Sequence, residues 1–286
     1  MAHAQIAFFA RLAKGGEAPL RSVFGQATKL SRNLHDVRYN ESRDEFYVTN
    51  QFAQAILTFR GGANGQEPPL RIIQGPKTML QSPDTLEVDA VNNEIIVPQD
   101  DNILFFPLTA NGDVAPIRVL HGGPKNGWRS ASGGIAVDPI HNIVAAAGTI
   151  LSDGNIWHNP RREGDHRESL LIFDRLANGD VKPLRVIRGP ETGMHVIRQM
   201  EIQPKGGWIV ISQMTDAEVP EPEGTFVGVW SINDEGDVPP RWKIDGKLSN
   251  GMLKPHGIAL DAKHKEVVVA DMRLNAILTF YFPEIF

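Results

Sequence analysis

The sequence predicts an all-β fold built from repeats, and three observations lead to this prediction. Short apolar segments recur along the chain, glycine-containing turns follow them at a fixed offset, and no longer stretch keeps the apolar spacing of an amphipathic helix. The apolar segment occurs six times, at residues 6–9, 56–59, 103–106, 170–173, 227–230 and 277–280. Successive copies lie 50, 47, 67, 57 and 50 residues apart, which gives a repeat of about 50 residues.

The other strands of the repeat follow from the same pattern. A turn at residues 14–16, 63–65, 110–112, 177–179 and 234–236 carries Asn-Gly, Gly-Gly or Glu-Gly, and glycine accepts the positive φ of a tight hairpin. A strand with Pro-Leu-Arg or a variant follows at 19–21, 69–71, 116–118, 183–185 and 240–242. Two further strands complete each unit, most clearly at 257–261 and 266–271.

Four short strands in a repeat of this length predict a β-propeller of four-stranded blades. Five complete units fit, with one strand left over, so five blades are expected and six, with one degenerate blade, are the alternative. We expect a single domain over residues 1–286, with the ring closed by strands from residues 20–24 and 257–280. The two long spacings predict loop insertions at 148–168 and 214–225.

Two segments resemble known propellers. Phe-Tyr-Val-Thr-Asn at 46–50 and Lys-Pro-His-Gly-Ile-Ala-Leu-Asp at 254–261, followed by Val-Ala-Asp at 269–271, are similar to the NHL-type propellers and to the bacterial propellers with a Tyr-Val-Thr-Asn signature. The resemblance covers essentially the whole chain. It implies that the innermost strand of each blade lines a central channel and that ligand sites lie at the mouth of that channel.

Composition limits the function. The net charge of −5 disfavours nucleic-acid binding, which needs a basic face, and no apolar run is long enough for a membrane helix. There is no cysteine, so disulfides and thiol nucleophiles are excluded. No phosphate-binding glycine loop is found, so no nucleotide or flavin is expected. We expect a soluble protein, cytoplasmic or secreted and without an intact signal peptide, that is a monomer or dimer and binds a small molecule.

Some residues recur at the same position in most repeats, and a role in the scaffold explains them better than a role in function. The recurring arginines are expected to support the blades, and the recurring aspartates are expected to bind turn amides. The arginines are Arg21, Arg71, Arg118 and Arg185, and the aspartates are Asp89, Asp138 and Asp261.

One repeat position changes its chemistry from blade to blade. The residue before the innermost strand is His35, Asp84, Gly133, Arg198 or His256. If the ring closes, His256, His35 and Asp84 fall on consecutive blades and form a candidate site for a divalent metal, zinc or iron. Gly133 would leave one side of this site open to substrate or water. Arg198 would bind an anionic group or a developing negative charge. A metal-free acid–base or hydrogen-bonding pocket, and a purely structural role, are the alternatives.

A further resemblance concerns residues 255–260 and 269–273. They are similar to a blade motif of the peptidylglycine amidating lyase, in which the histidine of the motif binds a channel zinc and an arginine shortly after Val-Ala-Asp is catalytic. His256 matches that histidine, and His35 stands at the equivalent repeat position. Arg273 is displaced by one residue, and a third histidine is missing, which puts the same activity in doubt.

Loops near the same mouth supply the remaining candidates. The expected ligand-binding residues are Asn50, Gln51, Trp128, Trp157 and Arg273. His195 or His158 would move protons, and Arg198 would stabilise negative charge. The sequence therefore predicts a lyase or hydrolase acting on a small, anionic molecule. A propeller that binds a ligand or protein without catalysis is the alternative.

Overall fold

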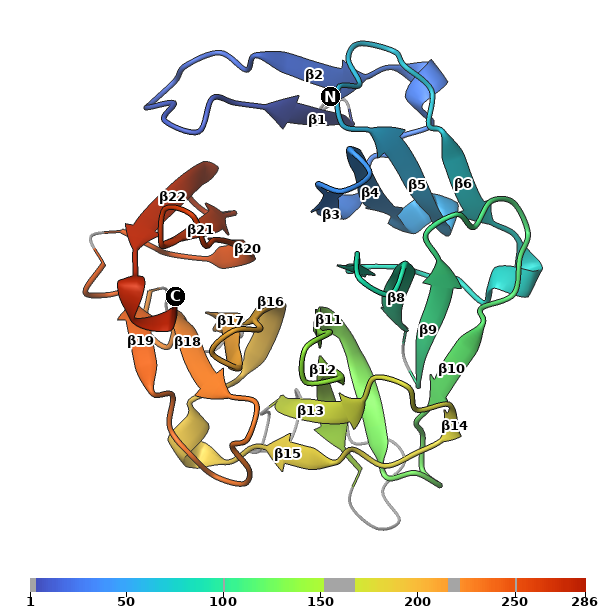
Figure 1. Ribbon diagram of the computed structural model, residues 1–286. Coiled ribbons are helices and arrows are strands. Elements are labelled where there is room, and N and C mark those ends of the chain that lie inside the picture. Colours follow the sequence, from blue (N-terminus) through green and yellow to red (C-terminus); the bar gives the residue numbers. More distant parts are fainter. Residues whose placement is uncertain (1–3, 100, 152–167, 216–221, 250) are drawn as a thin grey trace. The chain divides into compact units, whose positions relative to one another are not determined.

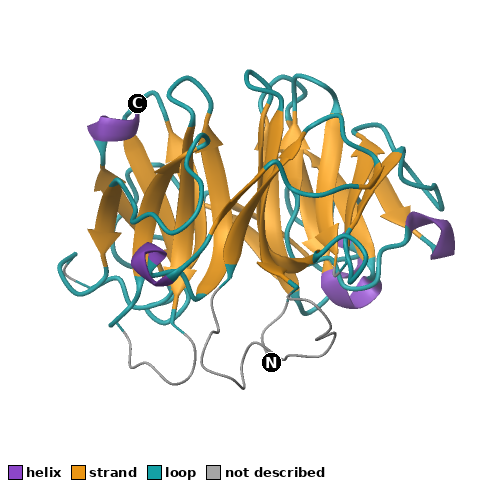
Figure 2. Ribbon diagram, turned by 90° about the horizontal axis from the view of Figure 1, so that it is seen from below, coloured by secondary structure: helices purple, strands orange, loops and turns teal. Residues whose placement is uncertain are grey.

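The structure is a computed structural model that describes residues 4–99, 101–151, 168–215, 222–249 and 251–286. Its residues form two compact units, each of which is described by itself. Unit 1 comprises Met1–Gln99 and Leu104–Ile117, and unit 2 comprises Asp100–Ile103 and Arg118–Phe286. The predicted all-β, five-bladed β-propeller fold is confirmed, since short antiparallel sheets account for nearly all regular structure (Figures 1 and 2).

Unit 1 holds a hairpin, one complete blade and most of the next. The strands are β1 (Gln5–Phe8), β2 (Arg21–Phe24), β3 (Leu34–Asn40), β4 (Glu45–Asn50), β5 (Ala55–Arg60), β6 (Arg71–Gln74), β7 (Glu87–Asp89), β8 (Glu94–Gln99) and most of β9 (Asn102–Pro107). β1 pairs with β2, and β3 to β6 form a four-stranded sheet in chain order. Short 3-10 helices are η1 (Gln26–Thr28), η2 (Gln51–Ala53) and η3 (Pro76–Thr78).

Unit 2 begins with the fourth strand of the second blade and continues with three more blades. Its strands are β10 (Arg118–His121), β11 (Trp128–Asp138), β12 (Ile143–Ile150), β13 (Ser169–Asp174), β14 (Gly179–Asp180), β15 (Arg185–Ile187), β16 (Val196–Gln203), β17 (Trp208–Met214), β18 (Phe226–Ser231), β19 (Trp242–Asp245), β20 (Pro255–Asp261), β21 (Glu266–Asp271) and β22 (Ala276–Tyr281). The sheets run β11-β12-β13-β15, β16-β17-β18-β19 and β20-β21-β22. The 3-10 helices are η4 (Pro190–Thr192) and η5 (Pro283–Ile285).

The same register recurs in three of the blades. Thr58 pairs with Arg71, Ile172 with Arg185, and Val229 with Trp242, always between the third and fourth strands. β1 and β2 pair in this register as well, with Phe8 opposite Arg21. β1 and β22 are therefore the two copies of the third strand that leave one strand over. β1–β2 belongs to unit 1 and β20–β22 to unit 2, so closure of the ring stays a prediction.

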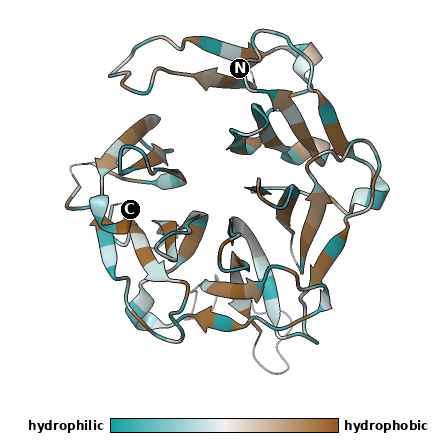
Figure 3. Cartoon of the chain, viewed as in Figure 1, coloured by the Kyte–Doolittle hydropathy of each residue, from teal (hydrophilic) through white to brown (hydrophobic). Residues whose placement is uncertain are grey.

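The strands of each unit bury separate hydrophobic cores. In unit 1 the core is built around Phe46, Leu57 and Phe59, and the rings of Phe46 and Phe59 stack with centroids 5.1 Å apart. Unit 2 has two clusters, one around Met200 and Trp230 and one formed between the fourth and fifth blades. Hydrophobic residues follow the strands and hydrophilic ones the turns (Figure 3). In the described part of the chain, no helix is long and apolar enough to cross a membrane.

The predicted glycine turns do more than reverse the chain. The fourth strand of a blade forms a parallel bridge to the glycine in the turn of the following repeat. The bridged pairs are Val23–Gly65, Ile73–Gly112, Leu120–Gly179 and Ile187–Gly236. The asparagine before the glycine adds a second bond, since Asn111 Oδ1 accepts the amide hydrogen of Ile72 at 3.0 Å and Asn178 Oδ1 that of Val119 at 3.1 Å.

The recurring arginines and aspartates are scaffold residues, as the sequence predicts. Arg118 Nη2 donates to the carbonyl of Arg175 at 3.0 Å, and Arg185 Nε donates to that of Ile232 at 2.9 Å. Asp138 Oδ1 accepts the amide hydrogens of Ile140 at 2.9 Å and of His141 at 3.0 Å. Asp89 binds the amides of Val91 and Asn92, and Asp261 that of His264, in the same way.

Candidate functional site

The variable position lies near the start of the first strand in three blades, where it holds His35, Arg198 and His256. In the other two, Asp84 precedes β7 and Gly133 lies within β11. The side chains at this position contact one another in pairs within each unit. In unit 1 the Nδ1 atom of His35 contacts the Oδ1 atom of Asp84. The side chain of His35 is 21% exposed and that of Asp84 9%, so the pair is shielded but reachable from solvent. A carboxylate at Nδ1 fixes the imidazole tautomer and leaves Nε2 as the basic nitrogen.

In unit 2 the same position joins Arg198 to His256. Arg198 Nη2 lies 2.8 Å from His256 Nε2, and both side chains are partly buried. A guanidinium has only hydrogen-bond donors, so Nε2 must be the acceptor. His256 is then a neutral imidazole whose proton is on Nδ1.

The His35–Asp84 and Arg198–His256 contacts form at the same position of the repeat. Arg198 lies two residues before Met200, which pairs with Ile211, and His35 lies two residues before Val37, which pairs with Val48. In each unit the residue at this position reaches its counterpart on the next blade. Neighbouring blades thus bring His35 to Asp84 in unit 1 and Arg198 to His256 in unit 2, while the expected grouping of His256 with His35 and Asp84 stays a prediction.

The donor atoms do not fit the predicted three-ligand metal site. Asp84 faces Nδ1 of His35, which is the place of a carboxylate that orients a histidine rather than the place of a metal ligand. Nε2 of His256 is engaged by a guanidinium cation, which repels a metal ion at that nitrogen. His35 and Asp84 belong to unit 1 and His256 to unit 2. We derive no chemical step through a metal.

The expectation that Gly133 leaves an opening is wrong. A Cβ built on Gly133 would lie 2.4 Å from the carbonyl oxygen of Ile197, in the next blade of unit 2. The adjacent Gly134 is equally tight, because its Cβ would lie 2.8 Å from the amide nitrogen of Met200. The two glycines allow the backbones of β11 and β16 to approach closely.

Two of the predicted ligand-binding residues lie buried in the scaffold. Asn50 is 1% exposed, accepts the amide hydrogen of Ser31 at 3.1 Å and donates to the carbonyl of Lys29 at 2.8 Å. Trp128 is completely buried, and its Nε1 donates to the carbonyl of Val181 at 2.7 Å. Both side chains have their polar groups satisfied inside the protein, which gives the prediction that they bind ligand no support.

The other loop candidates remain predictions. Gln51 begins η2 and accepts a hydrogen bond from the Asn33 side chain, and Arg273 is exposed after β21. The amide of His195 donates to Gln213 Oε1 at 3.0 Å, and its imidazole is partly exposed. Trp157 and His158 lie outside the described residues, as do most of the predicted insertion at 148–168 and the central part of that at 214–225.

The sequence interpretation missed a polar clamp beside each contact. In unit 1 the clamp consists of Asp36 and Thr49, and in unit 2 it consists of Gln199 and Ser212. The signal was present: at the fifth residue of the second strand counted in the repeat register, these two blades carry a hydroxyl, whereas the other three carry Pro98, Ala147 and Ala270. The long polar residue that it serves follows His35 or Arg198 directly.

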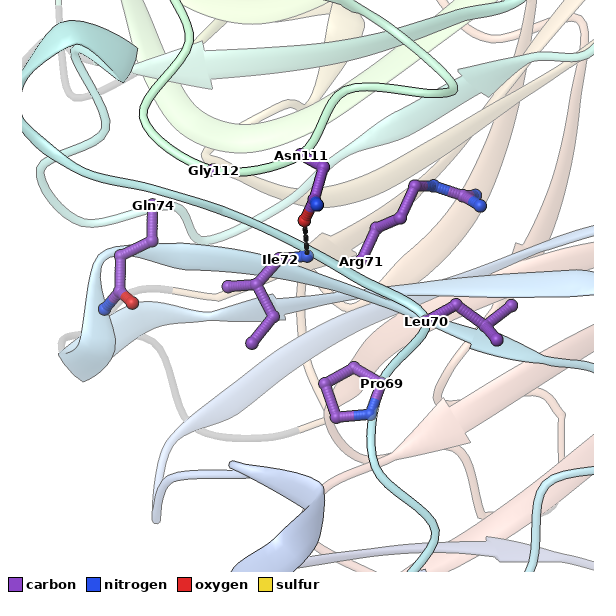
Figure 4. A pocket seen from close by; sticks show the side chains of 7 residues that line it. All are labelled: Pro69, Leu70, Arg71, Ile72, Gln74, Asn111 and Gly112. Atoms are coloured by element: carbon purple, nitrogen blue, oxygen red, sulfur yellow. Dashed lines mark hydrogen bonds between the residues drawn. The ribbon is translucent and has the colours of Figure 1, made fainter.

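Two other features lie apart from this position. Asp261, His264 and Glu266 each offer a ligand atom within 4.8 Å of the others, but His264 Nδ1 is 2.7 Å from Asp261 Oδ2, and His141 and Asp138 form the same pair in another turn. A hollow of about 340 Å³ is lined by Pro69, Leu70, Arg71, Ile72, Gln74, Asn111 and Gly112 (Figure 4). It lies along β6, at the opposite edge of the sheet from β3.

Comparison with known proteins adds no family assignment. No protein-family model matches the chain, and no curated protein matches it. The likeness to NHL-type and Tyr-Val-Thr-Asn propellers therefore remains a resemblance, and the five-bladed propeller fold is what the structure establishes.

Proposed function

We propose that this protein is an enzyme, a lyase or hydrolase of a small anionic molecule, in which His35 transfers the proton and Asp84 orients its imidazole. The observation that supports the proposal is the contact between an imidazole and a carboxylate at a position where the fold requires neither. The same position holds glycine in another blade, so blade formation does not explain the pair. Partial exposure of His35 gives a small solute access to the ring.

The chemistry follows from the geometry of the pair. Asp84 accepts the hydrogen on Nδ1 of His35, so Nε2 is the nitrogen that takes a proton from a substrate carbon or from water. The imidazolium that results is stabilised by the adjacent carboxylate. It can then return the proton to the leaving group. Both elimination and hydrolysis need this pair of proton transfers.

Arg198 and His256 form a second polar pair, which belongs to unit 2 and is proposed to bind an anion by itself. The guanidinium of Arg198 carries a permanent positive charge, and its bond to Nε2 turns the N–H of His256 away on the opposite side of the ring. Together they present donors of the kind that bind carboxylate or phosphate oxygens. An anionic substrate is the class that such donors favour.

The test is an activity screen with matched variants. Small carboxylate esters, lactones, phosphate esters and hydroxy acids are offered to the wild type, to His35→Gln and to Asp84→Asn. His121→Gln, which changes an exposed histidine, is the control. We expect His35→Gln to lower kcat by about 10²–10⁴-fold, as for loss of a general base, and the control to leave it unchanged.

Two results would contradict the proposal. Activity that survives His35→Gln at the wild-type rate would remove the pair from the reaction. Tight binding of a ligand with no turnover of any compound would favour the non-catalytic binding propeller. Elemental analysis of the same preparations tests the metal hypothesis, because one equivalent of zinc or iron lost in a His35→Ala/His256→Ala double variant would restore it.

A further inference from the structure

Asp84, the carboxylate of the His35–Asp84 pair, lies outside the sheet of its own blade. β7 begins only at Glu87, three residues after Asp84, whereas β3 and β20 include His35 and His256. The cause is in the sequence. Glu87 pairs with Ile96, so the same register would set Thr85 opposite Pro98, and proline has no amide hydrogen for the ladder. Asp84 therefore lies before the paired part of the strand.

Two residues of the first blade hold it instead. The hydroxyl of Thr49 donates to the carbonyl of Asp84 at 2.9 Å and accepts the amide hydrogen of Asp36, also at 2.9 Å. Thr49 is completely buried, so no water competes for these bonds. One hydroxyl thus joins the backbone next to His35 to the backbone of Asp84.

The carboxylate of Asp36 extends the same connection. Asp36 Oδ2 accepts the amide hydrogen of Leu86 at 3.1 Å, and Arg38 Nε donates to the carbonyl of Leu86 at 3.0 Å. Arg38 Nε also lies 3.4 Å from Asp36 Oδ2, which keeps that buried carboxylate paired. Three backbone groups between residues 84 and 86 are therefore tied to β3 and β4.

In unit 2 a similar clamp lies beside a site residue that belongs to its strand. The amide of Gln199 donates to Ser212 Oγ at 3.1 Å, and Gln199 Oε1 accepts the amide hydrogen of Ile258 at 2.6 Å. These two bonds match those that Asp36 makes with Thr49 and Leu86, but the hydroxyl of Ser212 donates to the carbonyl of Gln199 at 3.4 Å and not across the blade boundary. His256, however, already lies within β20. The clamp of unit 1 is the one that binds a site residue lying outside the strand of its blade.

We propose that Thr49 and Asp36 are positioning residues that hold Asp84 against Nδ1 of His35. The proposal rests on the proposed function, because it assigns these two residues to the same imidazole–carboxylate pair. It adds that the pair is assembled across a blade boundary by one buried hydroxyl. Neither residue touches a substrate. Their effect is on the tautomer of His35 and on the mobility of residues 84–86.

The experiment reads the tautomer directly. Long-range ¹H–¹⁵N correlation spectra of the imidazoles are recorded at one alkaline pH, for the wild type, Thr49→Val, Thr49→Ser and Ser212→Ala. Valine keeps the shape of threonine and loses the hydroxyl, serine keeps the hydroxyl, and Ser212→Ala removes the matching hydroxyl of unit 2. We expect His35 to be the Nδ1–H tautomer in the wild type, a tautomer mixture in Thr49→Val, and the wild-type state in the other two.

A second measurement guards against a folding artefact. Amide exchange of Leu86 should rise about tenfold in Thr49→Val, because a bond of about 1.4 kcal/mol is lost nearby. Asp36→Asn keeps an oxygen for the Leu86 amide and is expected to fold, with a smaller shift of His35 in the same direction. If Leu86 exchanges faster while the His35 tautomer stays unchanged in both variants, the clamp is structural only and the inference is wrong. If His35 lacks the Nδ1–H tautomer in the wild type, the proposed function fails instead.

Discussion

Gly133 shows how a missing side chain can be a packing requirement. At the level of the sequence, glycine among His35, Asp84, Arg198 and His256 looks like an opening. In the structure that space is filled by the carbonyl of Ile197, 2.4 Å from where a Cβ would be. We expect Gly133→Ala to lower the free energy of unfolding by about 1–3 kcal/mol, measured by urea denaturation. Gly16→Ala, where nothing lies within 4 Å, is the control, and equal effects would contradict this explanation.

Gln99 is a buried residue whose acceptor is not used by the rest of the described chain. It is 5% exposed, and its Oε1 has no hydrogen-bond partner among the described residues. At the same repeat position Gln213 accepts the amide hydrogen of His195, and Asp271 those of Leu253 and Lys254. A buried unpaired acceptor costs about 1–3 kcal/mol.

Exchanging Gln99 for an apolar side chain of similar length should therefore help the fold. We expect Gln99→Met to raise the free energy of unfolding by about 1 kcal/mol, because it removes the unpaired acceptor. Gln213→Met should lower it, because the bond from the His195 amide is lost. Denaturant titration of the two variants decides the matter. A loss of stability in both would show that Gln99 has a partner of equal importance.

The turns between strands carry part of the contact between consecutive repeats. Asn111 Oδ1 accepts the amide hydrogen of Ile72 at 3.0 Å, while Asn64 Oδ1 accepts that of Ser22 at a longer 3.4 Å. We expect Asn111→Ala to lower the free energy of unfolding by about 1 kcal/mol and Asn64→Ala by less. Asn111→Asp, which keeps the oxygen, should retain most of the stability. Urea titration of the three variants provides the measurement, and an equal loss in Asn64→Ala and Asn111→Ala would contradict the role of the bond.

Over the whole molecule, the sequence predicts the strands and turns that recur in the repeats. It does not predict the contacts that differ from blade to blade. The spacing of the apolar strands and turns predicts the blades, because register and φ are local properties. The position of His35, Asp84, Arg198 and His256 is also predicted, since it stands out against the repeat. Their partners are not, because those depend on hydrogen bonds between blades. The burial of Trp128 was missed for the same reason: an aromatic residue near a loop gives no sign that its ring packs against Phe173, with centroids 4.7 Å apart.

One network of the first blade couples the stability of the molecule to pH at both ends of the scale. Glu45 Oε2 accepts bonds from Arg71 Nη2 at 2.6 Å, Tyr47 Oη at 2.8 Å and Arg43 Nε at 3.2 Å. Burial favours a raised pKa for Glu45, but the bonds from Arg71, Tyr47 and Arg43 outweigh it and lower the pKa. Burial, followed by the bond to Glu45, raises the pKa of Tyr47.

The directions of these two pKa shifts determine the pH range over which the network stabilises the folded state. Because the pKa of Glu45 is lowered by folding, its contribution is complete above the ordinary carboxyl pKa and is lost as the pH falls through the pKa of the folded state. The pKa of Tyr47 is raised, so its contribution is complete below the ordinary tyrosine pKa and is lost as the pH rises above it. Glu45→Gln should flatten the acid limb of the stability profile, and Tyr47→Phe the alkaline limb. Urea midpoints across the pH range provide the measurement. Glu67→Gln is the control: the bond from Arg60 also lowers the pKa of Glu67, but the pair lies at the surface, where solvent screens the interaction, so a flattening as large as that of Glu45→Gln would contradict the assignment.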